Sequence, residues 1–172
     1  HLCCSQQESQ RDKLFTVVLT GGPCGGKSSA LATLRERLSR RGFHVITIPE
    51  AATPIFGNSG GYDLAWAGTE KHVHMQAAIC DWQKSQEDIF KRVSALRPDH
   101  TVMLLDRACI DGKMFCSAEE WSQVLDLCKE TEESLLARYD LCVHLTTCAD
   151  GRPEFYQFGP GSNNPSRFHT PD

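Results

Sequence analysis

The sequence has no apolar run near the roughly 18 residues that a membrane-spanning helix needs, and no basic-then-apolar secretion signal at its start. It has no excess of basic charge, because 18 lysines and arginines face 22 acidic residues. Nucleic acid is therefore not an expected partner. The nine scattered cysteines suit a reducing compartment better than a disulfide scaffold. We predict a cytoplasmic protein without a transmembrane segment, with peripheral membrane association as a further expectation.

Two motifs of regulatory GTPases are also missing. The sequence contains neither the N-K-x-D run that recognises guanine nor the D-x-x-G run that contacts the γ phosphate. It has no internal repeat, and its 172 residues predict one domain with its own core. If the chain binds nucleotide, we therefore expect an organisation like that of a kinase rather than that of a Ras-type switch.

A glycine-rich turn between an apolar strand and a helix is the strongest signal in the chain. Residues 14–20 are apolar or β-branched, the G-x-x-x-x-G-K-[ST] pattern follows, and leucines at helical spacing continue toward Gly42. Glycines let successive backbone N–H groups point into one concavity at a helix N-terminus, which suits a phosphate chain. The residues we assign to this phosphate-binding loop are Gly21, Gly22, Pro23, Cys24, Gly25, Gly26, Lys27, Ser28 and Ser29. The alternative is a glycine-rich turn with an ordinary solvated lysine.

Three more apolar runs predict strands, and helical patterns separate them. Strands are expected at 43–48, 101–105 and 141–145, and helices directly after the loop, at 69–97 and at 132–138. A Ser117–Glu120 capping box predicts a further helix, which carries Trp121, Val124, Leu125 and Cys128 on one face. Residues 54–68 carry four glycines and predict a mobile loop with a short helix near 62–67. The alternation predicts a doubly wound α/β domain, a three-layer α/β/α arrangement with a mostly parallel sheet.

Candidate catalytic residues fall at the carboxyl ends of these strands, where such sheets bind ligands. Lys27 would reach the β and γ phosphates, and Ser28 and Asp106 would hold Mg²⁺. The alternative for Asp106 is a strand-end aspartate paired with Arg107. Glu50 is a candidate general base, or a carboxylate that holds an acceptor or a metal-bound water. A helix-capping or solvated acid is the equally weighted alternative for Glu50.

Supporting roles are assigned to several other polar residues. Arg107 is a candidate phosphate or acceptor contact, with Asp111 as an acid behind it. The glycine-, proline- and aromatic-rich segment 146–172 predicts an active-site lid, with Arg152 and Arg167 as its candidate arginines. Residues 1–12 predict a disordered leader before a domain from 13 to 172, which we expect to be incomplete at its C-terminus. His72 and His74 lie two apart on a predicted helix, so we do not expect them to chelate one metal.

These motifs together resemble the NadR/TRPL-translocation-defect type of AAA domain. The resemblance rests on V-L-T-G-G-P-C-G-G-K-S at 18–28, P-E-A-A-T at 49–53, L-D-R at 105–107, R-Y-D at 138–140 and the N-N-P-S-R segment at 163–167. It covers nearly the whole chain from residue 13. It implies a kinase-like P-loop fold that lacks its last helix and strand here.

The resemblance implies two kinds of activity. Bacterial relatives phosphorylate a nicotinamide riboside, and eukaryotic relatives are GTP-binding trafficking proteins that also bind phosphoinositides and phosphatidic acid. The first hypothesis is therefore a Mg²⁺-dependent protein that binds GTP or ATP and acts as a lipid-linked regulator. The alternatives are a small-molecule kinase with a nucleoside-like acceptor, and a degenerate P-loop scaffold that binds nothing.

Overall fold

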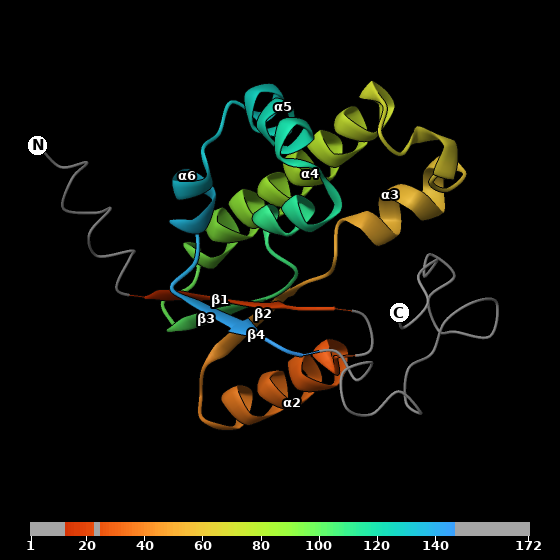
Figure 1. Ribbon diagram of the computed structural model, residues 1–172. Helices are drawn as coiled ribbons and strands as arrows, with labels where there is room; N and C mark the ends of the chain where they lie inside the picture. The colour runs from red at the N-terminus through yellow and green to blue at the C-terminus, as the bar shows by residue number, and fades with distance from the viewer. Residues whose placement is uncertain (1–12, 23–24, 147–172) are drawn as a thin grey trace, which may run out of the picture.

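The computed structural model describes residues 13–22 and 25–146. Within them, four strands form one parallel sheet with helices on both faces, a three-layer α/β/α arrangement that confirms the predicted fold class (Figure 1). The strands are β1 (Leu14–Thr20), β2 (His44–Ile48), β3 (Thr101–Asp106) and β4 (Leu141–His144). The helices are α2 (Lys27–Arg40), α3 (Ala52–Ser59), η1 (Leu64–Trp66), α4 (Glu70–Ser94), η2 (Cys109–Phe115), α5 (Ala118–Cys128) and α6 (Glu132–Leu136).

The strand order β2-β3-β1-β4 brings the carboxyl ends of the strands to one edge of the sheet. In the parallel register, Leu19 lies beside Asp106, and Leu105 lies beside Ile48. The loop after β1 therefore starts next to the end of β3, and the residues just after β2 follow on the other side of β3. This alignment places the predicted acids around the loop.

Alternate residues of each strand point to opposite sides of the sheet, and the two central strands β1 and β3 are largely buried because helices cover both faces. Val17 and Leu19 of β1 pack with the apolar face of α2, whereas Val18 packs on the opposite side with Phe90 of α4. Figure 1 shows α2 alone below the sheet and α3, α4, α5 and α6 above it. The sheet is thus the middle layer of the core.

A second apolar cluster joins the helices above the sheet. Trp121 and Val124 of α5 pack with Val73 and Ala77 of α4, and all four are buried. The predicted Ser117–Glu120 capping box at the start of α5 is confirmed, with both reciprocal hydrogen bonds present. These contacts fix the orientation of α5 against α4.

A charged group lies inside this helical layer, which we call the buried network: Glu87, Cys109, Arg138 and Tyr139. Glu87 is fully buried, and one of its carboxylate oxygens accepts from Arg138 Nε. The other accepts from the Tyr139 hydroxyl at 2.9 Å and lies 3.3 Å from Cys109 Sγ. Tyr139 also accepts from the Cys109 backbone N–H at 2.7 Å. The network ties α4 to the segments before β4 and after β3.

Two local predictions from the sequence need correction. Residues expected to form an irregular mobile loop include the α-helix Ala52–Ser59, although the short helix expected near 62–67 is present as η1. The 3-10 helix η2 was not predicted. The predicted leader, the lid and its candidates Arg152 and Arg167 lie outside the described residues. In the part of the chain that the structure describes, no helix is long and apolar enough to cross a membrane.

Candidate functional site

The start of the glycine-rich loop is pressed against the end of β4. Gly21 has φ +125°, and a Cβ added there would lie 2.0 Å from the Leu145 carbonyl oxygen. The Leu145 N–H in turn donates to the Thr20 carbonyl at 2.9 Å. Gly26, with φ +79°, caps the N-terminus of α2 in a left-handed conformation. The pattern therefore requires glycine at Gly21 for close packing and at Gly26 for backbone geometry.

Lys27 folds its side chain back over the loop. Its Nζ donates to the carbonyl oxygens of Gly21 at 2.9 Å and of Gly22 at 2.8 Å. Burial, together with the positive charge of Arg107, lowers the pKa of Lys27, although three carboxylates act in the opposite direction. The ammonium group therefore lies over the first two glycines of the loop.

Asp106 ends β3 with an unpaired carboxylate oxygen. Its Oδ1 is buried and has no hydrogen-bond partner within residues 13–22 and 25–146. Burial raises the pKa of Asp106, and the neighbouring Glu50 carboxylate raises it further. A buried acceptor without a donor costs free energy unless a ligand satisfies it, so this oxygen is a candidate for metal or water binding.

Arg107 occupies an uncommon backbone conformation. Its φ is +82°, a left-handed value that costs a side-chain-bearing residue free energy and is typical of functional sites. Its Nε lies 3.4 Å from Glu50 Oε1, and its Nη1 lies 3.6 Å from Asp111 Oδ2. Both nitrogens are buried, and neither forms a hydrogen bond with the residues that the structure describes. Arg107 therefore faces two carboxylates through N–H groups that form no hydrogen bond with the described residues.

The alternative that paired Asp106 with Arg107 is not what the structure shows. Among the described residues, the ion pairs of Arg107 are with Glu50 and Asp111. The backbone N–H of Arg107 donates to the Leu19 carbonyl at 3.0 Å, which extends the β1–β3 ladder past Asp106. Asp106 is thus left available to a ligand, and Arg107 is held by other acids.

Thr20, at the end of β1, is a residue that the sequence did not single out. Its buried hydroxyl lies 2.8 and 2.7 Å from the two carboxylate oxygens of Asp111 in η2. This contact ties η2 to the end of β1 and fixes Asp111, which in turn lies beside Arg107. The only signal in the sequence was a threonine directly before the first loop glycine, and many strands end in threonine.

Glu50 lies between the sheet and α3. Its Oε2 accepts from the Thr53 hydroxyl at 3.0 Å, and its Oε1 faces Arg107. The side chain is 29 % exposed, so solvent reaches part of it. Glu50 is therefore neither freely solvated nor fully paired.

The structure brings four predicted residues together, which we call the loop rim: Glu50, Asp106, Arg107 and Asp111. Arg107 forms ion pairs with Glu50 and Asp111, and Asp106 directly precedes it at the end of β3. Ser28 and Ser29 are exposed in the first turn of α2, which also starts at the loop. Pro23 and Cys24 lie outside the described residues.

The charges of the rim suit a divalent cation bound with a polyphosphate. Three carboxylates face the two cationic side chains of Lys27 and Arg107, so negative charge is in excess. Hard oxygen ligands are those that Mg²⁺ prefers, and it takes few of them from protein when it also binds phosphates. The unpaired Asp106 Oδ1 and the exposed Ser28 hydroxyl fit this role.

Comparisons with known proteins match this arrangement to a family. A family model described as an AAA domain matches residues 16–159, which include the loop and the whole rim. Among solved structures, 33 chains match. One is a cysteine-to-alanine mutant of the APS kinase CysC from Mycobacterium tuberculosis, 14 % identical, covering 87 % of this chain and 82 % of that chain, with a TM-score of 0.40. A search of curated proteins finds no match.

Proposed function

The chain belongs to the AAA domain family of P-loop nucleotide-binding proteins, and we propose that it binds the Mg²⁺ complex of GTP or ATP at Gly21–Ser29. One observation carries this proposal: Asp106 Oδ1 is buried without a partner in the described part of the chain, at the rim of a loop that holds Lys27. No group in the described protein donates a hydrogen bond to that oxygen, whereas a metal or its water would satisfy it.

The proposed roles follow from the positions of the side chains. Lys27 exchanges its two contacts with loop carbonyls for the β and γ phosphate oxygens. Ser28 and Asp106 would hold Mg²⁺, which when bound neutralises the phosphate charge that develops during phosphoryl transfer. Arg107 has its backbone fixed by Leu19 and its guanidinium held between Glu50 and Asp111, so its free N–H groups can contact a phosphate or an acceptor.

Thermal unfolding with Mg²⁺ and each nucleotide tests the proposal. At one hundred times its Kd, a bound nucleotide adds about 2.7 kcal/mol to the free energy of unfolding, or several degrees in Tm. We expect Lys27→Ala to abolish this shift, and Lys71→Ala, an exposed lysine on α4, to keep it. If neither GTP nor ATP raises Tm, or if Lys27→Ala responds as the parent does, the proposal fails and the degenerate scaffold is favoured.

A small-molecule kinase is the second candidate, and the position of Glu50 favours it. This partly exposed carboxylate lies at the rim beside Arg107, where it would accept a proton from an acceptor hydroxyl. We expect nucleotide turnover to rise only when a nucleoside-like acceptor is added. Glu50→Gln should lower that turnover about 100-fold, within the range typical of a lost general base. Equal turnover with and without acceptor would exclude a kinase for the acceptors tried.

The lipid-linked regulator rests on the resemblance of the motifs alone. It predicts that the protein co-sediments with liposomes containing phosphatidic acid or phosphoinositides, and that GTP changes the bound fraction. Whether the protein prefers guanine or adenine nucleotides is decided separately, by comparing the Tm shift with GTP to the Tm shift with ATP. Equal sedimentation with neutral and anionic liposomes would remove the regulator hypothesis and leave the nucleotide site untouched.

A further inference from the structure

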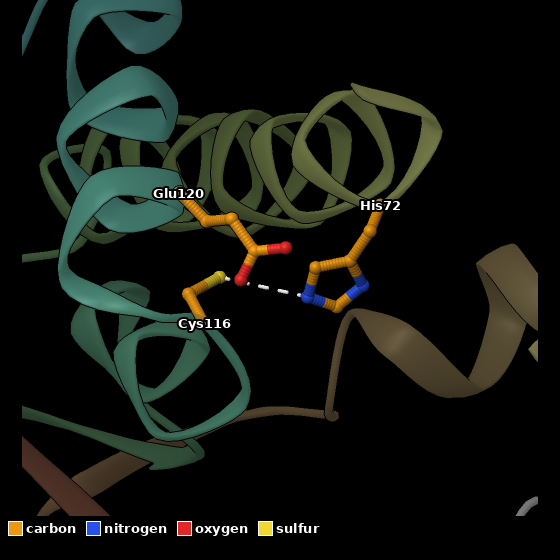
Figure 2. Close-up of side chains that lie close together, drawn as sticks. All are labelled: His72, Cys116 and Glu120. Carbon is orange, nitrogen blue, oxygen red and sulfur yellow. Dashed lines mark hydrogen bonds between the residues drawn. The ribbon is translucent and has the colours of Figure 1, made fainter. Parts of the chain in front are cut away.

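A second group of ligand-type side chains lies at the far end of the helical layer. His72 at the start of α4, Cys116 just after η2 and Glu120 in the first turn of α5 place an imidazole nitrogen, a sulfur and a carboxylate oxygen within 4.8 Å of one another. Figure 2 shows the three side chains pointing toward a common space from three separate segments. His72 is buried, and Cys116 and Glu120 are half-buried.

The imidazole of His72 is held in one orientation. Its Nδ1 lies 2.7 Å from the Tyr62 hydroxyl, and its Nε2 lies 2.8 Å from the Phe115 carbonyl oxygen and 3.7 Å from Cys116 Sγ. A histidine that binds a metal through one nitrogen almost always has the other fixed by a hydrogen bond. Tyr62 supplies that bond, and Nε2, which donates to the Phe115 carbonyl, also lies beside the thiol.

Glu120 provides an independent observation. Its Oε2 accepts from the Ser117 N–H at 2.7 Å in the capping box, but its Oε1 is buried and has no hydrogen-bond partner in the segments that the structure describes. A capping residue needs only one oxygen for the cap. The Glu120 carboxylate lies beside a thiol and an imidazole, and the cap does not use its second oxygen.

We propose that His72 Nε2, Cys116 Sγ and Glu120 Oε1 form a binding site for a divalent transition-metal ion of the zinc type. Nitrogen, thiolate and carboxylate are the three ligand types that zinc takes in proteins. With Zn–N near 2.0 Å and Zn–S near 2.3 Å, tetrahedral geometry separates the two ligand atoms by about 3.5 Å, close to the 3.7 Å found here. The Phe115 carbonyl or a water takes the fourth position.

Metal binding changes the protons of this site in a defined way. Burial and the Glu120 carboxylate raise the pKa of the Cys116 thiol to about 11, so the metal displaces a proton from sulfur to solvent. The His72 tautomer also changes, because Nε2 no longer donates to the Phe115 carbonyl and Nδ1–H donates to the Tyr62 oxygen. No electron is transferred. The metal would join α4, the end of η2 and α5, and η2 also carries Asp111 of the rim.

Competition titration of the full chain with Zn²⁺, in the absence of nucleotide, tests the site. We expect the chain to bind one Zn²⁺ ion, and Cys116→Ser to lower its affinity for Zn²⁺ at least about 100-fold. Even the loss of a residue that only hydrogen-bonds to a metal ligand lowers metal affinity about 10–100-fold. Because the chain has nine cysteines, Cys142→Ser is the matched control, an exposed cysteine on β4 that should leave affinity unchanged. His72→Gln should also weaken binding, and His74→Gln, an exposed histidine on the same helix, should not.

Cobalt provides a spectroscopic measurement of the same site. Co²⁺ should give a thiolate charge-transfer band and tetrahedral d–d absorption that are lost in Cys116→Ser. If that variant does not fold, Glu120→Gln decides, because glutamine at this position keeps the capping box but removes the charge. Weaker Zn²⁺ binding in Glu120→Gln supports the site. Equal affinity in the parent and these variants, or no binding at micromolar Zn²⁺, would overturn it.

Discussion

The buried network and the loop rim both keep charged side chains away from water, but they differ in how these charges are satisfied. In the network, both oxygens of Glu87 have partners, and Arg138 also reaches the Asp88 carboxylate. At the rim, Asp106 Oδ1 and two nitrogens of Arg107 are buried without a hydrogen bond to the described protein. Arg107 also has a left-handed backbone, whereas the network has no such residue.

This difference separates charge that holds the fold from charge kept for a ligand. A buried ion pair with every atom bonded is stable as it is, and removing one partner leaves the other uncompensated. A buried group with unbonded atoms reduces stability until something binds. The network is therefore expected to respond to mutation in stability, and the rim in nucleotide binding.

Removing Glu87 should have the largest effect on stability. Glu87→Ala leaves Arg138 and Tyr139 without their buried acceptor, which costs about 3–5 kcal/mol of unfolding free energy. For a chain of this length, that lowers Tm by roughly 10 °C. Urea unfolding measures the loss, and nucleotide affinity measured below Tm should change less than about twofold. If Glu87→Ala lowered nucleotide affinity as much as Lys27→Ala does, the buried network would belong to the nucleotide site and would not differ from the loop rim in function.

A double variant separates lost charge pairing from lost packing. Glu87→Met combined with Arg138→Met removes both charges and keeps similar volume, so most of the stability should return. The Tyr139 hydroxyl keeps the Cys109 N–H as a partner. If the double variant is as unstable as Glu87→Ala, packing rather than charge accounts for the network.

Gly21→Ala tests how closely the loop is packed against β4. The added Cβ would approach the Leu145 carbonyl oxygen to 2.0 Å at a positive φ, so the loop or the strand has to move. Over-packing and left-handed strain together cost about 2–4 kcal/mol. Gly42→Ala, also at positive φ but with open space around its Cβ, carries the strain alone and is the control in urea unfolding. Equal costs for the two variants would mean that the contact with Leu145 is unimportant.

Thr20→Val should have a smaller effect. It removes the hydroxyl that contacts Asp111 and leaves a buried carboxylate with fewer donors, which costs about 1–2 kcal/mol. Thr47→Val, at an exposed position of β2, should stay within about 0.5 kcal/mol. We also expect weaker nucleotide binding in Thr20→Val, because Asp111 then no longer fixes Arg107. Unchanged stability and binding would remove Thr20 from the site.

The pH dependence of stability should show the smallest effect. Because burial raises the pKa of Asp106 in the folded state, the folded protein holds this proton more tightly than the unfolded chain. The contribution of Asp106 to the free energy of unfolding is therefore greatest at a pH below the ordinary pKa of aspartate. It decreases as the pH rises from that pKa toward the higher pKa of Asp106 in the folded protein. Subtracting the Asp106→Asn curve from the parent curve isolates the change. A difference that rises with pH would contradict the unpaired state of Asp106.

The positions of the rim residues could be predicted because they depend on local patterns. An apolar strand followed by an acid identifies Glu50 and Asp106, and parallel pairing brings strand ends to one edge whatever the order of strands. The three strands after β1 were predicted to within one or two residues for the same reason. The pairing of Arg107 and the contact between Thr20 and Asp111 required the structure, since neither follows from a local pattern.

The buried network could not be predicted from the sequence. Glu87 and Arg138 are 51 residues apart in the sequence. Glu87 lies on a helix, and glutamates on helices are normally exposed to solvent. The same is true of His72, Cys116 and Glu120, which come together only through the packing of α4 and α5. The sequence pattern does not predict α3, because Gly57 and Asn58 are weak helix formers and Gly60, which ends the helix, is also typical of loops.

The central claim is that the unpaired carboxylate of Asp106 serves the Mg²⁺-nucleotide ligand. Unfolding of the parent and of Asp106→Asn, each with and without Mg²⁺ and nucleotide, tests this claim most directly. Without ligand, the variant should be more stable than the parent by about 0.5–2 kcal/mol, as expected when a functional site is relieved of an unfavourable charge. With Mg²⁺ and nucleotide, the parent should gain about 2.7 kcal/mol at one hundred times its Kd, and the variant should gain much less. A variant that is less stable without ligand, yet stabilised as fully as the parent with it, would contradict the assignment of Asp106 to the ligand.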